Sequence, residues 1–216
     1  PEFQPYLNTM KNQYEKANLV LALTPSTSMQ CFPKQISMPV VGRKGVCRRP
    51  EIFQLLNISH SKKLGLIYNG DFGMNSIPWK KLERFKAWNF IGLYPLPGNP
   101  HNYYLIDRTE FPYRDIFASV DVVISKIGYG VYSDCLTHGI PLIYVPRSDF
   151  SEHQVLEKAI KEWGYGFSLS HESYYSLRFD DVLFKIAIME KPSKYTFRGD
   201  EKCAYRIERF MRSIEI

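Results

Sequence analysis

A glycine-rich turn between a predicted strand and a predicted helix is the part of the sequence best suited to chemistry. The apolar run 120–125 predicts a buried strand, and Gly128 and Gly130 follow it before a short helical segment that ends near Gly139. Glycines at such a turn let backbone N–H groups approach a ligand closely, and the first helical turn carries unsatisfied donors and a partial positive charge. The turn is therefore suited to binding a diphosphate.

Two charged residues lie close to this turn. Asp134 falls near the first turn of the predicted helix, where its carboxylate could accept hydrogen bonds from the ribose hydroxyls of a bound nucleotide. Lys126 precedes the glycines and could neutralise phosphate as a point charge. The alternatives are that Asp134 only complements the helix dipole and that Lys126 is a solvated surface residue.

Short apolar runs that alternate with helical patterns predict the scaffold of this turn. The runs are rich in Ile, Leu, Val and Tyr, as strands buried on both faces are, and they span 64–69, 89–93, 103–107, 120–125, 142–145 and 166–169. Helices are predicted over 151–163, with Gly164 as C-terminal cap, over 180–190, and from about residue 200. The pattern predicts an α/β fold, a Rossmann-like parallel sheet with helices on both faces.

The first 45 residues have a different pattern. They contain one predicted strand, 19–23, and a connecting segment that ends in the basic stretch 42–49, which is too little to bury a core. We predict that 1–45 is the remnant of an N-terminal domain plus a linker, and that 46–216 is the α/β domain. Residues 1–3 have the sequence of a cloning scar, so we expect the natural protein to extend upstream of residue 4.

Composition narrows the function only a little. The chain has 216 residues, 44% of them hydrophobic and 23% charged, as in ordinary globular proteins, and no apolar run long enough to cross a membrane. The net charge of +6 comes from scattered Lys and Arg. It would suit an anionic ligand, an anionic membrane surface or nucleic acid about equally, and nothing but this charge favours nucleic acid.

The cysteines indicate a compartment and exclude a common kind of metal site. Cys31, Cys47, Cys135 and Cys203 are widely separated and have no companion histidines at zinc spacing. Isolated thiols are typical of a reducing compartment, so we expect a cytoplasmic protein. We also expect it to need no metal ion and no cofactor.

The order of these features resembles the C-terminal domain signature of GT-B glycosyltransferases, such as the peptidoglycan glucosaminyltransferase class. It consists of a strand, a Gly-rich turn, an acidic residue at Asp134, Gly-x-Pro at 139–141 and a second strand. The sequence is more closely similar to the glycosyltransferase-like region of plant L-arabinokinases, in the run 126–130 and the Arg- and Asp-containing loop 147–154. The likeness includes 39–43 and 69–73 and weakens after about residue 170.

The resemblance implies the C-terminal half of a GT-B fold that binds a nucleoside-diphosphate sugar, with a UDP-sugar as the expected donor. Transfer would need no metal, and the acceptor would bind to an N-terminal domain that this chain lacks. No catalytic residue is assigned, and we expect the chain alone to bind nucleotide without transferring sugar. By this resemblance, the diphosphate would contact Gly128, Tyr129, Gly130 and Val131, and the ribose would contact Asp134. The phosphates would also lie beside Gly70, Asp71, Phe72 and Gly73. The base would contact Thr109, Glu110 and Phe111, and the sugar would contact Glu152, His153 and Gln154.

Departures from the family pattern favour an alternative, a non-catalytic nucleotide-sugar-binding or scaffolding module of a larger protein. Lys126 and Ile127 stand where many members have His-Gly, Val131 replaces a common Ser or Thr, and Asp134 is shorter than the usual Glu. Gln154 also has an explanation without a sugar, because Ser151 and Gln154 have the spacing of a helix capping box.

Overall fold

The computed structural model describes residues 3–69 and 74–213, and the chain divides into two compact units. The larger unit is Gly42–Thr196, and the smaller unit combines Pro1–Val41 with Phe197–Ile216. The glycines and other residues predicted at 70–73 lie outside the described residues.

The larger unit is built on a six-stranded sheet in which every neighbouring pair is parallel. Its order is β5-β4-β3-β6-β7-β8, so the chain winds outward from β3 in one direction and then from β6 in the other, as in a Rossmann fold. The six predicted strands are confirmed, with ends that differ by at most two residues. They are β3 (Lys63–Tyr68), β4 (Trp88–Gly92), β5 (Tyr103–Leu105), β6 (Val122–Lys126), β7 (Leu142–Val145) and β8 (Gly166–Ser168).

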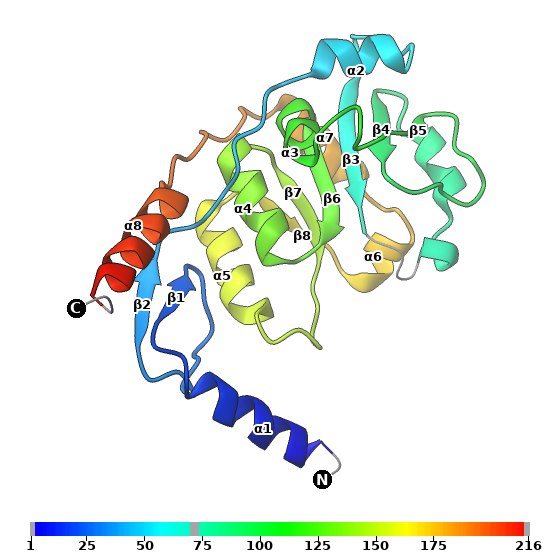
Figure 1. Cartoon of the computed structure of the whole chain (residues 1–216). Helices are drawn as coiled ribbons and strands as arrows, with labels where there is room; N and C mark the ends of the chain where they lie inside the picture. Colours follow the sequence, from blue (N-terminus) through cyan, green and yellow to red (C-terminus); the bar gives the residue numbers. More distant parts are fainter. Residues whose placement is uncertain (1–2, 70–73, 214–216) are drawn as a thin grey trace. The chain divides into compact units, whose positions relative to one another are not determined.

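Helical segments cover both faces of this sheet, which confirms the predicted α/β class. On one face, Val122 and Ile124 of β6 belong to a buried cluster with Tyr174, Leu183 and other residues of the segments that follow β8 and β3. Helices α3, α4 and α5 pack in succession along the opposite face (Figure 1). The helical segments of this unit are α2 (Arg49–Leu55), η1 (Met74–Ser76), η2 (Trp79–Arg84), α3 (Tyr113–Ser119), α4 (Tyr129–His138), α5 (His153–Trp163), α6 (His171–Tyr175) and α7 (Asp180–Ile188).

Two glycines end the helices that flank β7, as predicted. Gly139 closes α4 and Gly164 closes α5, both in the left-handed conformation with φ of 65° and 82°. A Cβ atom at Gly139 would also lie 2.4 Å from the carbonyl oxygen of Pro192, so this position needs glycine for two reasons.

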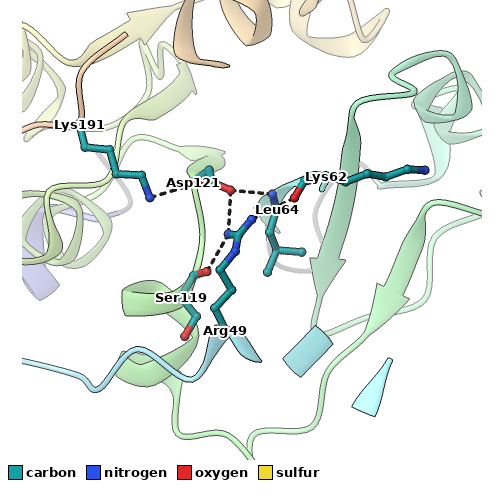
Figure 2. A network of polar contacts seen from close by, with 6 residues as sticks. All are labelled: Arg49, Lys62, Leu64, Ser119, Asp121 and Lys191. Carbon is teal, nitrogen blue, oxygen red and sulfur yellow. Dashed lines mark hydrogen bonds and ion pairs between the residues drawn. The ribbon is translucent and has the colours of Figure 1, made fainter. Parts of the chain in front are cut away.

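A buried carboxylate joins the amino ends of β3 and β6. Asp121 accepts the Leu64 N–H at 2.8 Å and pairs with Arg49 at 2.7 Å and Lys191 at 3.0 Å, as Figure 2 shows. Its own N–H donates to the Leu64 carbonyl at 2.7 Å. Burial raises the pKa of Asp121, but the Leu64 N–H, Arg49 and Lys191 outweigh burial, and the net pKa is lowered. This carboxylate therefore stabilises the fold most at neutral pH.

The smaller unit contains more regular structure than the sequence predicted. Strands β1 (Val20–Leu23) and β2 (Gln35–Met38) form a parallel pair, and the helices are α1 (Gln4–Tyr14) and α8 (Gly199–Arg212). The expectation of a single strand plus a connecting segment was wrong, because β2 is short, begins with an exposed Gln35 and lacks a continuous apolar run. The assignment of 1–45 to an N-terminal remnant stays a prediction. No helix among residues 3–69 and 74–213 is long and apolar enough to cross a membrane.

We predict that Asp121→Asn lowers the free energy of unfolding by about 2–4 kcal/mol at pH 7, since it leaves the part-buried Arg49 without a countercharge. The matched control is Asp180→Asn, which removes the exposed Arg84–Asp180 pair and should cost about 1 kcal/mol or less. Urea denaturation of both variants measures the difference. Equal losses would show that the Asp121 network adds nothing beyond a surface ion pair.

Candidate functional site

A cavity of about 810 Å³ lies at the carboxyl ends of the central strands. It is lined by residues at and just beyond the ends of three strands, namely Tyr68 and Asn69 at β3, 125–127 at β6 and 145–149 at β7. Val131 of α4 and His171 and Tyr175 of α6 complete the lining. Neighbouring strands β3 and β6 are the two from which the chain winds in opposite directions, and this switch point is where doubly wound sheets bind ligands. The position of the cavity thus follows from the strand order.

The amino end of α4 reaches this cavity. Gly128 is the N-cap, has extended backbone angles and contributes no side chain to cap the first-turn N–H groups; its carbonyl accepts the Tyr132 N–H at 3.0 Å. The first-turn N–H groups have no acceptor within the helix, and the aligned peptide dipoles give this end a partial positive charge. Val131, in the first turn, lines the cavity. This end of α4 can accept an anion.

The glycines of the turn leave space around the backbone. A Cβ atom added at Gly128 or Gly130 would meet no described atom within 4 Å, and neither residue has a positive φ. Neither the packing of the described residues nor the local backbone conformation requires glycine here, in contrast to Gly139. The open space is what close approach of a ligand to the backbone would require.

Two cationic side chains line the cavity. Lys126 ends β6, and Arg147 follows β7 with its guanidinium 4.5 Å from the ring centroid of Phe150 and 3.9 Å from Asp149. The pKa of Lys126 is lowered, first by desolvation and next by the charge of Arg147, which Asp149 partly offsets. An anion placed between these cations would relieve their repulsion. Among the described residues, no group of three or more His, Cys, Asp or Glu side chains is arranged to hold a metal ion.

Asp134 lies on α4 but does not line the cavity. Burial raises its pKa to about 6, and the charge of Arg43 acts in the opposite direction. The side chain is electrostatically coupled to Tyr113, whose ring centroid lies 5.1 Å from that of Tyr68. Tyr68 lines the cavity, so Asp134 interacts with a ring that is itself in contact with a cavity residue.

The predicted base contacts are placed apart from the cavity. The Thr109 N–H donates to Asp107 Oδ1 at 2.8 Å, and Phe111 is buried with the Arg48 guanidinium 5.3 Å from its ring centroid. Glu110 lines a second, shallower depression of about 450 Å³ near the ends of β4 and β5. Thr109, Glu110 and Phe111 are therefore not brought together with the glycine turn in one cavity.

The predicted sugar contacts are also outside the cavity lining. Glu152 is the N-cap of α5 without a side-chain cap, so the Ser151–Gln154 capping box does not form. His153 lies 3.5 Å from Glu157, its Nδ1 is 3.5 Å from the Arg147 N–H, and Gln154 is exposed. His153 therefore lies against the backbone of Arg147, in the segment that follows β7.

The cavity includes residues that the sequence analysis did not assign. Tyr68 is the last residue of β3, Ser125 lies near the end of β6, and His171 and Tyr175 belong to α6, a helix of one turn. A five-residue helix has too little periodicity to be recognised in a sequence. The available signal was position: α6 directly follows β8, and the carboxyl ends of parallel strands share one edge of the sheet.

Comparison with solved structures identifies the fold. The chain is similar to the spinosyn forosaminyltransferase SpnP, with TM-score 0.54 and 14% identity over 90% of this chain and 55% of that one. It is also similar to the glycosyltransferase of kitacinnamycin, with TM-score 0.52 and 18% identity, and to the glycosyltransferase VinC in complex with dTDP, with TM-score 0.52 and 13% identity. These matches cover 72% and 71% of this chain, and 41% and 40% of the other chains. The chain has the fold of one half of a GT-B glycosyltransferase.

Sequence comparison gives a distant relative with the same kind of region. The chain is 23% identical to an L-arabinokinase of Arabidopsis thaliana over 160 residues, which is 72% of this chain but only 15% of that protein. The predicted resemblance to the glycosyltransferase-like region of L-arabinokinases is confirmed. No protein-family model matches the chain.

We predict that Asp134→Asn raises the free energy of unfolding by about 1–2 kcal/mol at pH 8, a range reduced because the carboxyl group is only partly buried. A carboxyl group whose pKa is raised on folding destabilises the fold above that pKa and does so no longer below its unfolded value. The gain should therefore shrink as the pH falls through 6 towards 4. Urea denaturation across this range tests it, and a loss of stability at every pH would contradict it.

Proposed function

We propose that the larger unit binds a nucleoside-diphosphate sugar and forms the donor half of a metal-independent glycosyl-transfer site. This proposal rests mainly on the amino end of α4. It starts with a glycine turn that leaves space beside the backbone, and it reaches a cavity lined by Lys126 and Arg147. A UDP-sugar is the donor we expect. VinC, with a similar fold, was solved in complex with dTDP.

The diphosphate would occupy the space at the glycine turn. First-turn N–H groups of α4 would donate to its oxygens, and the space beside Gly128 and Gly130 would admit them. Lys126 and Arg147 would add countercharge from the ends of β6 and β7. Arginine can bind a phosphate in a bidentate manner and lysine acts as a point charge, so the two would supply different contacts.

The nucleoside would extend from the diphosphate past Tyr68 towards Asp134. Ionised Asp134 would accept hydrogen bonds from the ribose hydroxyls, and its burial beside Tyr113 makes the unbound carboxylate unfavourable. An ionised carboxylate whose burial costs folding free energy, close to a cavity, is typical of a functional site. The loop 109–111 would need to move from its present contacts to reach the base.

In transfer, the same residues would stabilise the negative charge that develops on the departing nucleoside diphosphate. The α4 dipole, Lys126 and Arg147 are present before reaction, so little reorganisation would be needed. The acceptor and the base that deprotonates it would come from outside these assigned residues. If the protein binds donor but transfers no sugar to any acceptor, the larger unit is a nucleotide-sugar-binding module instead.

We predict that the chain binds UDP and that Asp134→Asn weakens this binding by about 10- to 150-fold, the equivalent of one or two charge-assisted hydrogen bonds. Asp134→Glu should retain much of the affinity. Calorimetric titration with UDP, dTDP and GDP measures the effect and identifies the preferred base.

Asp180→Asn is the matched control, because that carboxylate is exposed on α7, pairs with Arg84 and does not line the cavity. It should leave the affinity for UDP unchanged. If Asp134→Asn is more stable than the wild type yet binds UDP equally well, Asp134 has no part in the site. If none of the three diphosphates binds the wild type, the proposed function is wrong.

A further inference from the structure

The cavity is larger than a diphosphate and extends beyond the amino end of α4. At about 810 Å³ it is in the upper part of the range of whole small-molecule sites. It reaches across the edge of the sheet, because α4 packs on one face with α3 and α5, whereas Tyr174 of α6 packs in the cluster on the other face. Figure 1 shows α4 (green) and α6 (gold) on either side of the end of β6. A ligand whose phosphates contact α4 can therefore extend to α6.

The wall on the α6 side is aromatic with polar edges. His171 and Tyr175 are one helical turn apart, their ring centroids are 6.0 Å apart and their planes differ by 6°. Both line the cavity, together with Asn69 at the end of β3. The ring faces present apolar surface, while the imidazole nitrogens and the phenol hydroxyl can exchange hydrogen bonds. A sugar ring has the matching character, with C–H groups on its faces and hydroxyls around its edge.

This wall is held firmly against the sheet. Tyr174, between the two cavity residues, is fully buried and its hydroxyl donates to Asn69 Oδ1 at 2.5 Å. Ser170 caps α6 by accepting the Ser173 N–H at 3.1 Å. The backbone that carries His171 and Tyr175 is thus held in place before any ligand binds, which reduces the entropy lost on binding.

The residues that the sequence resemblance implied for the sugar do not line the cavity. His153 is paired with Glu157 and contacts the Arg147 backbone, and neither Glu152 nor Gln154 lines the cavity. The α6 wall is the part of the cavity lining on the sheet face opposite α4, and its rings are the largest uncharged side chains there.

We propose that His171 and Tyr175 form the subsite for the glycosyl group of the donor and determine which sugar is accepted. This inference rests on the proposed function, since it places the sugar beyond a diphosphate bound at α4. The sugar face stacks on the two rings, and its hydroxyls bond to the Tyr175 hydroxyl, the His171 imidazole and the Asn69 side chain. Glu152, His153 and Gln154, at the amino end of α5, do not touch the sugar.

The test compares the affinities for UDP, UDP-glucose, UDP-galactose and UDP-N-acetylglucosamine in the wild type, His171→Ala and Tyr175→Ala. His171 is exposed and Tyr175 half-buried, so both variants should fold, and their melting curves check this. The controls are His60→Ala and Tyr205→Ala, whose side chains do not line the cavity. Titration calorimetry gives, for each protein, the ratio of the affinity for each UDP-sugar to that for UDP.

We expect both variants to bind UDP within about twofold of the wild type and to weaken the best-bound UDP-sugar by about 5- to 30-fold, the loss of one ring contact with its hydrogen bond. Tyr175→Phe should restore part of the loss because it keeps the ring. Unchanged ratios would overturn the subsite, and so would equal losses for UDP and its sugars. A wild type that binds no UDP would contradict the proposed function itself, and the subsite with it.

Discussion

The parallel pairing of β3 with β6 is the constraint on which the rest of the larger unit depends. At their amino ends these strands are joined by Asp121, which accepts the Leu64 N–H and neutralises Arg49 and Lys191. At their carboxyl ends the chain leaves in opposite directions, so no connection crosses the gap between them. The gap between β3 and β6 is therefore bridged by Asp121 at the amino ends of the strands, and no connection crosses it at their carboxyl ends.

This opening determines what the neighbouring elements can do. Because β6 leads directly into the glycine turn, α4 begins at the opening and directs its dipole towards it. Because β7 is the next strand outward, its following loop brings Arg147 to the same edge. The continuation through β8 brings α6 over the opposite face. An anion site and an aromatic wall thus arise from one strand order without any element that departs from the α/β pattern.

Asp134 illustrates a conflict between stability and function. Its carboxyl group is buried enough to raise the pKa to about 6, and Arg43 compensates only in part. An amide or an apolar side chain would suit this position better in the unbound protein. The same burial would strengthen hydrogen bonds from a ribose. Stability and binding should therefore respond in opposite directions to one substitution, which a purely structural residue would not do.

The sequence predicted those features that have a local physical signal. Six strands could be recognised from apolar runs, and the helix ends at Gly139 and Gly164 from glycine placement. The glycine turn was predicted because strand, turn and helix are adjacent along the chain. Elements without such a signal were missed, among them the short strand β2 and the one-turn helix α6.

Among the described residues proposed for the site, those close in sequence to the glycine turn include cavity-lining residues, whereas those from distant segments do not line the cavity. Lys126 and Val131 line the cavity, as expected for residues that flank the turn. The roles of 109–111 and 152–154 came from family resemblance alone, and here Phe111 is buried and His153 lies 3.5 Å from Glu157. His171 reaches the cavity through the strand order, which no local pattern encodes.

The most direct test of the central claim is the response of the α4 backbone amides to UDP in a ¹⁵N-correlation spectrum. If a diphosphate binds at the amino end of α4, the amide signals of Gly128, Gly130 and Val131 should shift most, in proportion to occupancy. The amides of Gly139 and Gly164, at helix carboxyl ends, should remain in place. Saturable binding of UDP that shifts other amides and leaves those of the glycine turn unchanged would contradict the account.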